Sequence, residues 1–145
     1  MAEKWGRRLF AAGALWLVLL GLVHSLSLIG NPQPANETER QLLDLMSNYK
    51  FSLMGSMRSM DNLVRGFSVS FMLGCLVVGI MDWALRRERA ELLKRVALVN
   101  TVWLAAMTAV SLRYFFVVPT SFLGVALLIF ALATVRLPAR AQPSA

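Results

Sequence analysis

Apolar residues form four runs long enough to cross a lipid bilayer. The predicted spans cover residues 9–29, 66–85, 96–118 and 120–135. A helix rises about 1.5 Å per residue, so roughly 20 apolar residues cross about 30 Å of hydrocarbon. The first run is longer than the apolar part of a signal peptide, which favours an uncleaved anchor. We predict an all-α fold, a four-helix transmembrane bundle, with residues 1–145 forming a single membrane domain.

The segment between the first two spans has a different pattern. Its apolar residues recur every three or four positions, as in an amphipathic helix. They are Leu42, Met46, Tyr49, Leu53, Met57, Met60, Val64 and Phe67. Asn36 with Glu39, or Thr38 with Gln41, can cap such a helix. We therefore predict an extra amphipathic helix over residues 38–65, lying on the membrane or continuing the second span, with any break at Gly55-Ser56 or Gly66.

Composition and charge then exclude a soluble domain and orient the chain. Hydrophobic residues make up 57% of the chain and charged residues 16%, against about 25% charged in soluble domains. The net charge is +7. The N-terminus, the 86–95 loop and the C-terminal tail, which includes Arg136 and Arg140, together contain ten basic and three acidic residues, and Asp82 at the inner end of the second span is a fourth acid on that side. The positive-inside rule places these three segments in the cytoplasm, so the charge indicates a multi-pass protein of the cell (inner) membrane without a nucleic-acid partner.

Polar residues of three spans fall at one predicted depth. His24 lies about 8 Å and Arg113 about 9 Å below the outer surface, counted along a helix. The second span is expected to add a single helical stripe of four residues. These are Arg58, Asp61, Arg65 and Ser68. The six residues are our candidate site for an anionic headgroup, because charges inside lipid are costly without a partner or a purpose.

A purely structural explanation of the same residues stays open. Arg113 could extend toward the surface along its aliphatic stem. Asp61 could be neutralised by Arg58 and Arg65, and His24 could bond to a neighbouring hydroxyl or carbonyl. Near the inner end, Asp82 is expected to pair with Arg86 at the i+4 position.

No pattern in the sequence predicts catalysis. One histidine does not make the usual metal site, and we expect no metal and no cofactor. Cys75 is expected to be inert packing, and glycines in the first two spans are expected to allow close helix packing. These are Gly13, Gly21, Gly74 and Gly79. The favoured function is binding of membrane lipids, an amphiphile or a partner membrane protein. The alternatives are an accessory subunit or homo-oligomer, and a small transporter or membrane enzyme using His24.

Several short segments resemble an uncharacterised family of small bacterial four-helix integral membrane proteins. They are Leu20-Gly21-Leu22-Val23-His24, Arg58-Ser59-Met60-Asp61, Gly66-Phe67-Ser68-Val69-Ser70 and Tyr114-Phe115-Phe116. The resemblance implies an integral membrane protein with recurrent polar positions at His24, Asp61 and Ser68. The family has no established activity that could be carried over to this chain. The chain departs from it at Gly30-Asn31-Pro32-Gln33-Pro34, which is polar where aromatic residues are expected.

Overall fold

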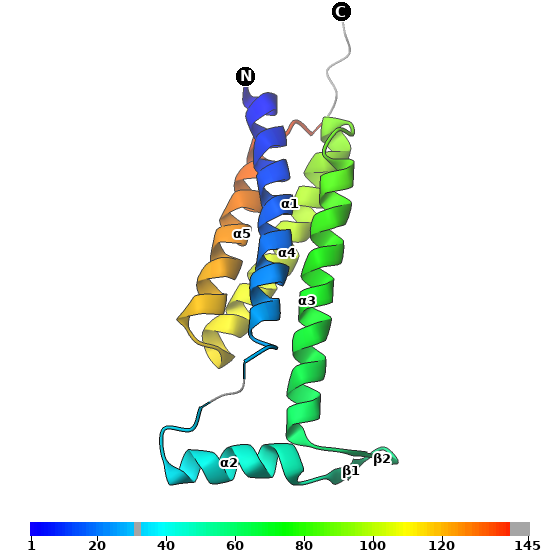
Figure 1. The fold of residues 1–145 in the computed structure, drawn as a ribbon. Helices are drawn as coiled ribbons and strands as arrows, with labels where there is room; N and C mark the ends of the chain where they lie inside the picture. The colour runs from blue at the N-terminus through cyan, green and yellow to red at the C-terminus, as the bar shows by residue number, and fades with distance from the viewer. Residues whose placement is uncertain (31–32, 140–145) are drawn as a thin grey trace, which may run out of the picture. The chain divides into compact units, whose positions relative to one another are not determined.

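A computed structural model describes residues 1–30 and 33–139. Among these residues it has five helices and one antiparallel pair of strands (Figure 1). The elements are α1 (Ala2–Leu26), α2 (Glu37–Asn48), β1 (Phe51–Leu53), β2 (Ser56–Arg58), α3 (Met60–Leu85), α4 (Ala90–Tyr114) and α5 (Val117–Arg136). Asn31, Pro32 and Arg140 of the sequence patterns lie outside the described residues.

Helices α1, α3, α4 and α5 are long and apolar enough to cross a membrane. They confirm the all-α fold and the four predicted spans, and they identify a membrane protein. The third span ends earlier than predicted, at Tyr114 and not at residue 118. Pro119 is the reason, because its ring would clash with the carbonyl four residues earlier. Pro119 instead lies in the first turn of α5, where a helix needs no backbone N–H from it.

The chain divides into two compact units. The first unit combines Met1–Leu20 with Cys75–Ala145, and the second is Gly21–Gly74. The first unit therefore contains parts of all four long helices. In α1 and α5 its buried apolar residues repeat every three or four positions, so each of these two helices has one interior face. The buried apolar residues of the unit include Phe10, Ala14, Leu17, Leu20, Cys75, Leu93, Ala97, Leu104, Leu123, Ala126, Phe130 and Ala133.

Aromatic side chains hold α1 against α5 in the first unit. Phe10 and Phe130 meet edge to face, with ring centroids 5.9 Å apart. Trp16 stacks on Phe122 and donates its indole N–H to the carbonyl of the same residue at 3.0 Å. A Cβ at Gly13 would lie 2.8 Å from the Phe130 ring, so this glycine makes room for the aromatic core.

Helix α3 also approaches α1 at a glycine. A Cβ at Gly79 would lie 2.8 Å from the carbonyl oxygen of Ala14 and 2.8 Å from a methyl of Val18. The close packing expected at Gly13 and Gly79 is therefore confirmed. At Gly74 a Cβ would meet nothing within 4 Å, so that part of the expectation is wrong.

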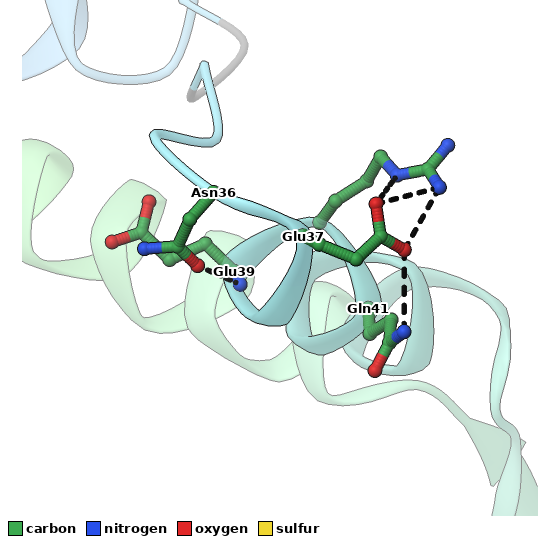
Figure 2. Close-up of polar contacts among 5 residues, drawn as sticks. Asn36, Glu37, Glu39 and Gln41 are labelled. Atoms are coloured by element: carbon green, nitrogen blue, oxygen red, sulfur yellow. Dashed lines mark hydrogen bonds and ion pairs between the residues drawn. The ribbon is translucent and has the colours of Figure 1, made fainter.

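In the second unit, α2 begins where the capping pattern predicts. The side chain of Asn36 accepts a hydrogen bond from the backbone N–H of Glu39 at 2.9 Å (Figure 2). The Glu39 carboxylate accepts one from the N–H of Ala35 at 2.7 Å. These bonds satisfy backbone donors that a helix start leaves free. None of the residues of α2 is buried.

The helix predicted over residues 38–65 is interrupted between Asn48 and Met60, and residues 60–65 are helical as the start of α3. Strands β1 and β2 follow, with Leu53 paired to Ser56 across a two-residue turn. Met54 and Gly55 both have positive φ, +48° and +84°, as a type I′ hairpin turn requires. In a strand, residues on one face recur every two positions. Apolar residues spaced by three or four across the turn therefore do not share one face, as they would in a helix. The interruption lies at the Gly55-Ser56 position named as an alternative.

Candidate functional site

The predicted polar stripe of the second span is only partly present. Asp61, Arg65 and Ser68 lie on one face of α3, at i, i+4 and i+7. The Arg65 Nε donates to the Asp61 carboxylate at 2.8 Å. A second guanidinium nitrogen of Arg65 donates to the Leu28 carbonyl at 3.5 Å, in the turn that follows α1. Arg65 therefore connects the start of α3 to the end of α1 and neutralises Asp61.

Arg58 does not belong to this helical stripe. It is the last residue of β2, and its guanidinium donates to the carbonyl of Met57 at 2.9 Å. Helix α3 begins after Ser59, whose hydroxyl accepts from the N–H of Asn62 while its own N–H donates to the Asn62 side chain, both at 3.3 Å. This reciprocal cap ends the strand, and the expectation that Arg58 continues the helix is wrong. In the described part of the chain Arg58 has no carboxylate partner.

His24 lies in the last turn of α1 and is half-buried. Its ring meets the edge of Phe71, with centroids 4.9 Å apart and planes at 72°. Its Nε2 is buried and has no hydrogen-bond partner among the described residues. The hydroxyls of Ser25 and Ser27 bond instead to the backbone carbonyls of Leu22 and His24. Among the described residues, the Nε2 of His24 therefore lacks the hydroxyl or carbonyl partner that the sequence analysis expected.

His24 and Arg113 lie closer to the ends of their helices than the predicted span bounds place them. Helix α1 ends at Leu26, so His24 is two residues, or about 3 Å, from the end of its helix. Arg113 is one residue from the end of α4. Exposed carbonyls at a helix C-terminus favour cationic side chains, which suits Arg113.

Arg113 belongs to the first unit, and the other five candidate residues belong to the second. Its exposed guanidinium lies 5.8 Å from the centre of the Tyr114 ring, within range of a cation–π interaction. The structure therefore brings together His24 with Phe71 and Asp61 with Arg65, while Arg113 has its own local partner.

The sequence patterns did not predict the most deeply buried polar pair of the described residues, Asp82 and Asn100. Asn100 of α4 donates to the Asp82 carboxylate of α3 at 2.6 Å, and the two residues are 6% and 3% exposed. The predicted pairing of Asp82 with Arg86 is wrong, because the Arg86 guanidinium lies 4.1 Å from the centre of the Trp83 ring and donates to the Trp83 carbonyl. One signal was available: Asp82 continues the interior face formed by Cys75 and Gly79.

Among residues 1–30 and 33–139 no group of three or more His, Cys, Asp or Glu side chains could hold a metal ion. The second unit contains cationic and hydrogen-bonding side chains near the end of α1 and the start of α3, namely His24, Arg58, Arg65 and Ser68. This set can neutralise and bond an anion. Comparisons with family models, with curated proteins and with solved structures find no match to this chain.

Proposed function

We propose that this is a multi-pass protein of a bacterial cell (inner) membrane with both termini in the cytoplasm. Support comes from the segments beside the start of α1, the α3–α4 loop and the end of α5. Their described residues include nine lysines and arginines. Trp5 and Trp83 lie in the same segments, where Arg8 and Arg86 rest on their rings at 5.9 and 4.1 Å. Basic loops are typical of the cytoplasmic side of a membrane, and tryptophans are typical of either membrane boundary.

We propose further that the second unit binds the anionic headgroup of a lipid or other amphiphile at the outer boundary. The buried, unpartnered Nε2 of His24 carries this proposal, because an imidazole nitrogen can donate to or accept from a headgroup oxygen. Arg58 supplies a guanidinium without a carboxylate partner, whereas Arg65 is committed to Asp61. Ser68 lies on the same face of α3 as Arg65 and offers a hydroxyl.

The chain contains a single histidine, which allows a direct test. With ¹⁵N-labelled histidine in dodecyl maltoside micelles, the only imidazole signals come from His24. Dodecyl phosphate should shift the Nε2 signal saturably, and dodecyl phosphocholine should shift it less because its headgroup has no net charge. Arg58→Gln should weaken the dodecyl phosphate titration about fivefold, the effect of about 1 kcal/mol for one basic residue at a charged surface.

Arg87→Gln is the matched control. It removes an exposed arginine from the α3–α4 loop and should leave the titration unchanged. Absence of a saturable shift, or equal weakening by Arg58→Gln and Arg87→Gln, would overturn the headgroup site.

A role as an accessory subunit is the second candidate, favoured by the surface of α2. Leu42 and Leu45 are 55% and 58% exposed, and Tyr49 directly after the helix is 65% exposed. Purification in mild detergent tests this role. Stoichiometric association with a larger membrane protein that is lost in a Leu42→Ser, Leu45→Ser variant would support it, and a monodisperse single species would refute it.

A further inference from the structure

A groove of about 370 Å³ runs between α1 and α5 in the first unit. It is lined by Trp5, Leu9, Leu132 and Arg136. The two helices are close at this end, since a Cβ at Gly6 would lie 2.9 Å from the Leu137 side chain and 3.1 Å from the Arg136 backbone. Close packing at Gly6 therefore sets Arg136 beside the first turns of α1.

The lining residues change from apolar to cationic along the groove. Leu9 lies about one turn after Trp5 in α1, and Leu132 lies about one turn before Arg136 in α5. The two leucines therefore form an apolar part beneath a polar rim. Trp5 is 56% exposed, and Arg136 is exposed at the last residue of α5. An indole and a guanidinium above two leucines match the interface where lipid headgroups meet acyl chains.

The arginines at this end differ in whether they are already paired. Arg7 bonds to the Glu3 carboxylate at 2.9 Å and to the Glu88 carbonyl at 2.6 Å. Arg95 bonds to Glu91. Within the described residues Arg136 has no carboxylate partner, and Arg8 rests on Trp5. Arg136, which lines the groove, and Arg8, which lies beside Trp5, can therefore neutralise an external anion at the groove.

A second groove of about 310 Å³ in the same unit provides a comparison. Its lining residues are Leu112, Phe115, Phe116, Val117, Thr120 and Ser121, and none is charged. The hydroxyls of Thr120 and Ser121 bond to the carbonyls of Phe116 and Val117. This groove can accept an acyl chain but has no group that selects a headgroup charge.

We propose that the α1–α5 groove binds an anionic phospholipid, with one acyl chain on Leu9 and Leu132 and the phosphate at Arg136. Arg8 supplies a second positive charge beside the indole. The guanidinium recognises the phosphate by paired N–H donors and charge. This site shares no residue with the headgroup site of the second unit, so either can fail without the other.

Native mass spectrometry tests the site on the full chain. The protein is equilibrated with equal amounts of phosphatidylglycerol and phosphatidylcholine that carry identical acyl chains. The parent should retain phosphatidylglycerol preferentially, and Arg136→Gln should reduce that preference about fivefold, since one basic residue near a charged surface contributes about 1 kcal/mol. Arg87→Gln should retain the preference of the parent.

Filling the groove separates the acyl contribution from the charge. Leu132→Trp should reduce the retained amount of both lipids, whereas Arg136→Gln should change only their ratio. The proposal is overturned if the parent shows no preference, or if Arg87→Gln lowers the preference as much as Arg136→Gln. An unchanged tryptophan fluorescence spectrum in Arg136→Gln checks that the variant is folded.

Discussion

The buried pair of Asp82 and Asn100 gives the sharpest test of the packing in the first unit. Asn100→Leu keeps the side-chain volume nearly constant and removes the amide that donates to Asp82 at 2.6 Å. Because Asp82 is 3% exposed, little water can replace that donor. The variant therefore measures the cost of leaving a buried carboxyl group without its hydrogen bond.

The expected loss of unfolding free energy for Asn100→Leu is about 1 kcal/mol. An unsatisfied buried acceptor costs about 1–3 kcal/mol, and interhelical hydrogen bonds in membranes lie at the lower end of that range. The double variant Asp82→Leu, Asn100→Leu removes both polar groups and should return to within about 0.5 kcal/mol of the parent, because no unpaired group remains. The single effects then do not add.

Equilibrium unfolding by increasing SDS in mild detergent micelles, followed by tryptophan fluorescence, measures these differences. Asn48→Leu is the matched control, because Asn48 donates to Asp44 at 2.7 Å but both residues are exposed. Its effect should stay within about 0.5 kcal/mol, as for other surface substitutions. The reasoning is refuted if Asn100→Leu destabilises no more than Asn48→Leu, or if the double variant loses the sum of the single effects.

Three further predictions follow from local geometry. Gly79→Ala should destabilise by about 2 kcal/mol in the same unfolding assay because its Cβ would meet an α1 carbonyl at 2.8 Å, whereas Gly124→Ala, with nothing within 4 Å, should be neutral or stabilising. Hydrogen bonds from two neighbouring side chains lower the pKa of Glu37 below its ordinary 4.5. Their stabilisation of α2 is complete above that value and lost as the pH falls through the lower folded pKa. The hydrogen-exchange protection factors of the α2 amides should therefore fall in acid, and Glu37→Gln should remove that pH dependence. Both turn positions require positive φ. Met54→Asn should therefore slow amide exchange in the β-hairpin, and Gly55→Ala should speed it by destabilising the hairpin by about 1 kcal/mol. Equal exchange in both variants would contradict the turn assignment.

Much of the fold could be predicted because membrane insertion depends on local composition. Each span is an apolar run of sufficient length, and a helix satisfies its own backbone in lipid without help from other segments. The Asn36 cap of α2 was equally local, because its partner is three residues away. The third span was predicted too long because apolar residues continue through Phe115 and Phe116, where Pro119 prevents one continuous helix.

The candidate site was predicted less well because side-chain partners depend on contacts between elements. The pairing of Asp61 with Arg65 followed from helical spacing, and the structure confirms it. The packing of His24 on Phe71 joins α1 to α3, and spacing within either helix does not predict it. Arg58 was assigned to a helix because the apolar residues keep their three-to-four spacing through this segment of the sequence. The turn with two positive φ angles interrupts the helix there and leaves that spacing unchanged.

The amino-acid sequence by itself determined four membrane-spanning helices and the asymmetric distribution of basic residues, because both depend on composition within short segments. Only the tertiary structure decided that Asp82 bonds to Asn100, 18 residues away, and that Gly6 and Gly79 are points of close helix approach. Hydropathy is a sum over neighbouring residues. The partner of a side chain depends instead on how each helix is rotated about its axis and offset along it, and the packing of the other helices determines that arrangement.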